Sequence, residues 1–126
     1  MKAVLSISLP LPPPELSPNS RIHWRRRAEL TKRARSDASA VAMLAMHQSG
    51  FPFPWLEVEL RTSWYWRDKR SMSDDDNLIG RFKAVRDGIA DAGVVSDDRW
   101  FRLDCPIQCV DRNAPRLDVI MTGTLP

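Results

Sequence analysis

Five prolines stand between residues 10 and 18 and divide the chain into two parts with different periodicity. They are Pro10, Pro12, Pro13, Pro14 and Pro18. Because proline has a fixed φ and no amide hydrogen, this segment cannot form a helix interior or a central strand. We therefore expect a rigid, extended connector with a strand before it and a helix after it. A proline-rich docking segment is the alternative interpretation.

Apolar residues predict a strand before the prolines and a long helix after them. Between Val4 and Leu9 apolar residues alternate with serines, which is the pattern of a half-buried strand. From Trp24 to Gln48 small apolar residues recur at helical spacing, and glycine and prolines follow directly after. The stripe, narrow enough for close packing, consists of Leu30, Ala34, Ala38, Val41 and Ala45.

The remaining sequence continues to alternate between strand and helix patterns. We expect a strand from Trp55 to Trp66, a helix from Asn77 to Asp91, and strands at about Trp100 to Val110 and Arg116 to Thr124. The order β-α-β-α-β-β predicts an α/β (α+β) fold in which a mixed β-sheet packs against two main helices. A length of 126 residues leaves room for one core, so residues 1–126 are expected to form a single small domain.

Composition excludes several classes of protein. With 43% apolar and 28% charged residues, the chain has ordinary globular values, which argues against a disordered or disulfide-rich protein. No apolar run approaches roughly 18 residues and the N-terminus does not resemble a secretory signal, so we expect a cytoplasmic protein without a membrane partner. Cys105 and Cys109 lie about 13 Å apart in one expected strand, too far for a mutual disulfide, and reduced thiols are expected.

Basic and acidic residues are segregated along the chain, although the net charge is only +3. Residues 21–35 contain seven basic residues and one acid, whereas residues 68–98 contain eight of the sixteen acids. Separate blocks of this kind can hold a polyanion with one and a cation with the other. Two solvated faces are the alternative. The aromatic run at 64–66 can stack on bases, but core packing is the favoured interpretation.

The densest acidic motif stands where a loop is expected to enter the second helix. In Asp74-Asp75-Asp76-Asn77 an extended approach would place Asp74 and Asp76 on the same side, where two carboxylates can meet one hard divalent ion. The alternative is structural, because acids at a helix N-terminus suit the macrodipole and Asp76 or Asn77 can be a simple cap. The residue spacing does not fit an EF-hand.

Two further features raise the expectation of a site. Asp76, Lys83 and Asp87 lie within about 40° of one another on the expected helix, opposite its buried stripe. On the same side, Gly80 would permit a close backbone approach. A Lys83–Asp87 ion pair on a solvated face is the alternative. After the helix, one carboxylate of the pair at 97–98 is expected to return toward the first motif as a third ligand, with an acidic turn as the alternative.

Together these motifs resemble the RusA family of Holliday junction resolvases, known from phages and prophages. The similar segments are Leu9-Pro10-Leu11-Pro12-Pro13, Asn19, Arg21, His23, Trp24, Asp74 to Leu78, Lys83, Asp87-Gly88-Ile89, Ala92-Gly93-Val94 and Asp97-Asp98. They cover most of the chain, and their order and spacing are fairly specific. Lys83 departs from some members by three inserted residues, about 4.5 Å along the helix axis, and Ser73 stands where some members have arginine.

The resemblance implies a small α/β homodimer that cuts four-way DNA junctions symmetrically with Mg²⁺, in the cytoplasm of a bacterial host. Carried over residue by residue, it implies Asp74, Asp76 and Asp98 as catalytic metal ligands and Lys83 as a catalytic lysine. We expect the ion, with Mn²⁺ as the alternative, to activate water while the lysine stabilises charge on the phosphate. The basic residues expected to bind DNA are Arg21, Arg25, Arg26, Arg27, Arg67, Lys69 and Arg70.

Two other functions stay open at this point. One is a protein that recognises branched DNA without cutting it, and the other is a nuclease that prefers flaps or single strands. The motifs of P-loop enzymes, serine hydrolases and zinc proteases are absent, so those chemistries have no support. The nuclease hypothesis depends on Asp98 converging with Asp74 and Asp76 on one ion.

Overall fold

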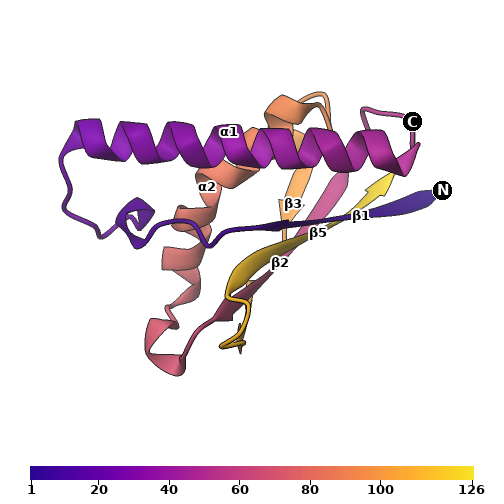
Figure 1. Cartoon of the computed structure of the whole chain (residues 1–126). Helices are drawn as coiled ribbons and strands as arrows, with labels where there is room; N and C mark the ends of the chain where they lie inside the picture. The colour runs from indigo at the N-terminus through magenta and orange to yellow at the C-terminus, as the bar shows by residue number, and fades with distance from the viewer.

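The computed structural model describes residues 1–126, which form one mixed sheet with two helices on one of its faces (Figure 1). The strands and helices are β1 (Lys2–Leu9), α1 (Trp24–Ser49), β2 (Val58–Trp66), α2 (Asp75–Ala92), β3 (Phe101–Leu103), β4 (Ile107–Val110) and β5 (Arg116–Thr124). Three short 3-10 turns connect them, namely η1 (Pro14–Leu16), η2 (Lys69–Ser71) and η3 (Asp98–Trp100). The predicted α+β class is confirmed.

The sheet has the order β1-β5-β2, with β3 and β4 both paired to the far edge of β2. The β1–β5 and β5–β2 pairs are antiparallel, whereas β3 and β4 run parallel to β2. Side chains along β1, β2 and β5 alternate between buried and more exposed positions, as the period of two predicts. The helices therefore cover only one face of the sheet.

The strand predicted from Trp100 to Val110 is divided into β3 and β4, which is a correction to the expected order. Leu103 pairs with Leu60 and Ile107 pairs with Ser63, so three residues of the outer chain stand opposite two of β2. An extra residue of this kind forms a bulge, and Pro106 within it has no amide hydrogen for the ladder. One continuous strand is therefore replaced by two short ones.

The core lies between the helices and the covered face of the sheet. It contains Trp64 and Trp66 from β2, which are buried, with ring centroids 5.7 Å apart. Core packing is thus confirmed for both tryptophans. From α1, Ala38 and Ala42 are fully buried, and α2 crosses close to them. The small residues of α1 allow this approach, although Ala42 was absent from the predicted stripe.

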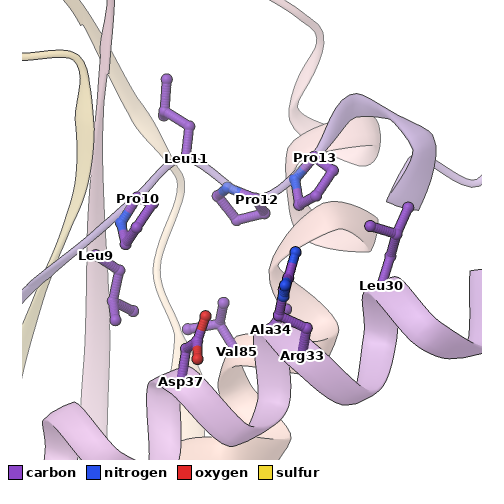
Figure 2. A pocket seen from close by; sticks show the side chains of 10 residues that line it. All are labelled: Leu9, Pro10, Leu11, Pro12, Pro13, Leu30, Arg33, Ala34, Asp37 and Val85. Carbon is purple, nitrogen blue, oxygen red and sulfur yellow. The ribbon is translucent and has the colours of Figure 1, made fainter.

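The proline segment runs between β1 and η1 and passes over α1. An apolar crevice of about 140 Å³ lies beneath it, and Figure 2 shows Pro10, Pro12 and Pro13 on one side with Ala34 and Asp37 of α1 on the other. No 3-10 turn begins before residue 14, so the segment has the extended form that its prolines predict.

Two other expectations concern the cysteines and the membrane. Cys105 and Cys109 are both free thiols, the first exposed and the second half-buried, as the spacing predicts. Neither α1 nor α2 combines the length and apolar character that a membrane-spanning helix requires.

Candidate functional site

Asp74 ends the loop before α2 and caps the helix. Its Oδ1 accepts a hydrogen bond of 2.8 Å from the backbone amide of Asn77, while Asp75 and Asp76 occupy the first turn and are exposed. Only Asp74 has the expected extended backbone, with φ of −72° and ψ of 163°, because Asp75 and Asp76 already belong to the helix. The extended alternation that was expected to place Asp74 and Asp76 on the same side therefore does not reach Asp76. A side-chain cap is therefore present, but Asp74 provides it rather than Asp76 or Asn77, because α2 begins two residues earlier than predicted.

The loop at residues 17–20 packs against this end of α2. The Ser17 hydroxyl and the Asn19 side-chain amide both donate to Oδ1 of Asn77, at 2.9 and 3.0 Å. A Cβ atom at Gly80 would lie 2.4 Å from the ring of Pro18, so only glycine permits this contact. The close approach expected at Gly80 is therefore confirmed.

A polar cavity of about 380 Å³ opens between this loop and the segment that precedes α2. Its lining residues are Pro14, Ser17, Asn19, Ser20, Ser71, Met72, Ser73 and Arg81. The wall at Ser73 is fixed by Gln108 of β4, whose side chain bonds both the amide and the carbonyl of Ser73 at 3.0 and 2.7 Å. The start of α1 and the start of α2 lie at the same end of the molecule (Figure 1).

Basic residues stand next in the sequence to the segments that form both walls of this cavity. Arg21, Arg25 and Arg26 follow the 17–20 loop, and Arg67, Lys69 and Arg70 precede Ser71; all six are exposed. Some of them have weak partners, since Arg26 lies 3.8 Å from Glu15 and Arg70 lies 3.7 Å from Asp68. Two basic segments far apart in the sequence thus flank one end of α2.

Arg27 differs from the other predicted DNA-binding residues. It is half-buried, and its Nη2 donates to the carbonyl oxygens of Ser17 and Ser20 at 3.3 and 2.9 Å. These bonds hold the 17–20 loop against α1. The structure therefore gives Arg27 a structural contact that the basic block alone did not indicate.

Trp24, beside these arginines, is an exposed aromatic side chain. Its ring stacks on His23 at 5.6 Å, the guanidinium of Arg25 lies 5.2 Å from its centroid, and 68% of its surface is exposed. An exposed aromatic ring among cations offers a stacking surface for a nucleic-acid base.

Lys83 lies further along α2, on the same side of the helix as Gly80. Its Nζ is 3.3 Å from Oδ2 of Asp87, so the predicted ion pair forms. Lys83 follows Asp76 by seven residues, about 10 Å along the helix axis. The lysine is therefore displaced from the acidic turn and already has a carboxylate partner.

Asp98 lies at the opposite end of α2 from Asp74 and Asp76. It stands three residues before Phe101, which pairs with Val58 at the start of β2, whereas Ser73 is bonded to Gln108, which pairs with Trp64 near the end of β2. Six residues of strand separate those positions, about 20 Å. The convergence expected of Asp98 with Asp74 and Asp76 does not occur within one chain.

The residues around Asp98 form local contacts instead. The carbonyl oxygen of Asp98 accepts a hydrogen bond of 3.4 Å from Arg86, in the C-terminal half of α2. Asp97 caps η3, and the amide of Arg99 and then its guanidinium lower the pKa of this carboxyl group. These contacts match the acidic-turn alternative for Asp97.

A three-carboxylate metal site does not fit a single copy of this chain. No group of three or more His, Cys, Asp or Glu side chains is placed to hold an ion. Asp74 and Asp76 remain as two carboxylates at the first turn of α2. Asp98 of the same chain lies too far away to join them. A site that uses all three requires a second copy of the chain.

Sequence reasoning missed Arg81, which lines the polar cavity from α2. The missed signal is its place on the helix, three residues after buried Leu78 and directly before buried Phe82. At 100° per residue this position belongs to the apolar face. An arginine at a position on the apolar face is therefore expected to be buried, and a buried charge needs partners that stabilise it.

Comparison with known proteins finds a relative that matches nearly the whole chain. A protein of Xylella fastidiosa, described as uncharacterized, is 40% identical to the chain over 126 residues, which cover 98% of this chain and 79% of the relative. The chain belongs to the same family as that protein. No protein-family model matches the chain. The shared family spans nearly the whole fold, including both ends of α2.

Proposed function

We propose that this chain is a Mg²⁺-dependent endodeoxyribonuclease of the RusA type, which resolves four-way DNA junctions as a homodimer. The observation that carries the proposal is the polar cavity at the N-terminal end of α2, which has exposed basic segments on both sides and three exposed aspartates, Asp74 to Asp76, beside it. Exposed arginines and lysines bind backbone phosphates by counterion release. Base stacking on Trp24 would add contact without sequence preference.

The placement of Asp98 determines the kind of dimer that the proposal needs. An interface with two-fold symmetry presents the same surface twice, in opposite directions. A two-fold axis that is perpendicular to α2 and passes beside its middle, on the exposed side, would bring Asp98 of a second copy to Asp74 and Asp76 of the first. Each substrate strand would then meet one of two equivalent sites, as paired symmetric cleavage requires. One chain alone does not supply three carboxylates to an ion, so catalysis would need both copies.

Exposed apolar side chains support an association between copies. Ile79 on α2, Trp100 in η3 and Ile107 on β4 are 43%, 46% and 52% exposed. Ile79 and Trp100 belong to the two elements that such an axis would bring together. Burial of large apolar side chains is the main favourable contribution to most protein interfaces.

A second candidate is a protein that binds branched DNA without cutting it. The cap that Asp74 provides and the cap that Asp97 provides favour it, because both carboxylates have structural roles. A nuclease that prefers flaps or single strands is the third. All three proposals place nucleic acid at the same end of α2.

One assay separates these functions. Synthetic four-way junction, flap and linear duplex are incubated with the protein and Mg²⁺, and both cleavage and binding are measured for Asp76→Asn. We expect the junction to be cut and the variant to lose cleavage while binding persists. Asp75→Asn, which makes the same charge change on the neighbouring exposed residue, serves as the matched control. Undiminished cleavage by Asp76→Asn would refute the assignment of the site.

A further inference from the structure

Arg81 is a buried charge without a counter-ion. Only 7% of the residue is exposed, and no carboxylate lies within ion-pair distance. Its Nη2 donates to the carbonyl oxygen of Pro12, and its guanidinium lies 5.6 and 5.2 Å from the ring centroids of Trp64 and Trp66. The Nε atom is buried and has no hydrogen-bond partner.

This environment leaves the guanidinium undercompensated. Burial lowers the pKa of Arg81, and Glu15, the carboxylate that opposes this effect, pairs with Arg26 instead. Arginine nevertheless stays charged in proteins, and buried charges are nearly always paired. The two tryptophan rings stabilise the cation electrostatically, but a ring offers no lone pair that could accept a hydrogen bond from Nε.

The cavity that Arg81 lines is suited to an oxyanion. Ser20 and Ser73 line the cavity, and the hydrogen bonds that side chains make to them use their backbone atoms and leave both hydroxyls free. No carboxylate is among the lining residues. The Gln108 side chain and the Asn77 side chain hold the two walls in place. A preformed set of donors around a cation is the chemistry that binds phosphate.

We infer that this cavity binds a phosphate oxyanion, with Arg81 as its cation and the hydroxyls of Ser20 and Ser73 as further donors. The existence of the pocket is independent of nuclease activity. The identification of its ligand as a phosphate of the DNA backbone rests on the proposed function. A backbone phosphate bound in the pocket would lie beside Asp74. The same chemistry would accept a free phosphate, so the experiment has one arm for each source.

The test is nuclear magnetic resonance of the arginine Nε–H groups during titration with inorganic phosphate. We expect the Arg81 signal to move and saturate. Arg86 is the matched internal control, because its Nε is also buried without a partner but lies outside this cavity. The Ser20→Ala/Ser73→Ala variant removes two donors without touching Arg81 and should weaken phosphate binding about tenfold. A stationary Arg81 signal, or unchanged affinity in the double variant, would overturn the inference.

A second arm uses a short single-stranded oligonucleotide that lacks a terminal phosphate. Movement of the same Arg81 signal supports a backbone phosphate as the ligand. Movement with inorganic phosphate alone supports the pocket as a site for free phosphate and overturns the assignment to DNA. The junction assay is read separately, so that cleavage without an Arg81 response refutes the pocket, whereas an Arg81 response without cleavage refutes the nuclease.

Discussion

Gly88 of α2 lies directly against the backbone of Arg35 in α1. A Cβ atom at position 88 would come within 2.2 Å of the Arg35 carbonyl oxygen and 2.9 Å of the Ala38 side chain. The oxygen belongs to the backbone of a 26-residue helix and cannot turn away. This contact sets how closely the two helices approach where they cross.

Gly88→Ala should therefore destabilise the protein by about 3 kcal/mol, the upper end of the range for an overpacked core. Denaturation by urea, followed by circular dichroism, measures the loss. Gly50→Ala is the comparison, because Gly50 has open space around it and a φ of 71°. It should cost only about 1 kcal/mol, from left-handed strain alone. Equal effects of the two substitutions would contradict the close contact.

The bidentate pair between Arg35 and Asp91 should make stability depend on pH. Arg35 donates to both carboxylate oxygens, at 2.5 and 2.8 Å, and these bonds lower the pKa of Asp91. A carboxyl group whose pKa is lower in the folded state adds stability above its unfolded pKa of about 3.9, and this stability is lost as pH falls through the folded value.

The measurement is the free energy of unfolding of Asp91→Asn and of the native protein between pH 7 and about pH 2. The difference between them should be constant at neutral pH, shrink below about pH 4 and vanish in strong acid. The pair is exposed, so the difference is expected to be small and to fall with added salt. Asp37→Asn, which removes an exposed α1 carboxylate without an ion pair, should show no such trend.

The basic segment before α2 should contribute to DNA affinity through charge alone. The Lys69→Ala/Arg70→Ala variant removes two phosphate contacts, so the slope of log affinity against log salt should become shallower by about 2. Fluorescence anisotropy with a four-way junction over a range of salt concentrations measures this slope. Arg102→Ala, an exposed arginine of β3 at the other end of β2, should leave it unchanged. An equal change in both variants would place the DNA elsewhere.

The elements of this fold follow largely from local patterns, whereas the site depends on where their ends meet. Alternating and helical periodicity placed five of the segments to within about three residues, and α1 begins at Trp24 as expected. The break at Pro106 carried a local signal, because proline disrupts a ladder. The burial of Arg81 carried one as well, in its place on an apolar helix face.

The position of Asp98 was the principal error, and it has a geometric cause. An 18-residue helix lies between the two acidic motifs and is about 27 Å long. In a parallel β-α-β connection the helix returns to the start of the first strand, so that its two ends cannot meet. The periodicity of a sequence predicts which residues share a face of a helix or strand. It does not predict which end of the sheet each motif lies at.

The most direct test of the account mixes two inactive variants, Asp76→Asn and Asp98→Asn, under conditions that exchange subunits. If each site takes Asp76 from one copy and Asp98 from the other, a mixed dimer carries both substitutions in one site and none in the other. Half of the dimers in an equal mixture are mixed, so about a quarter of the native strand-cleavage rate should return. A mixture as inactive as its parents, or full activity of Asp98→Asn alone, would contradict the proposed two-chain site.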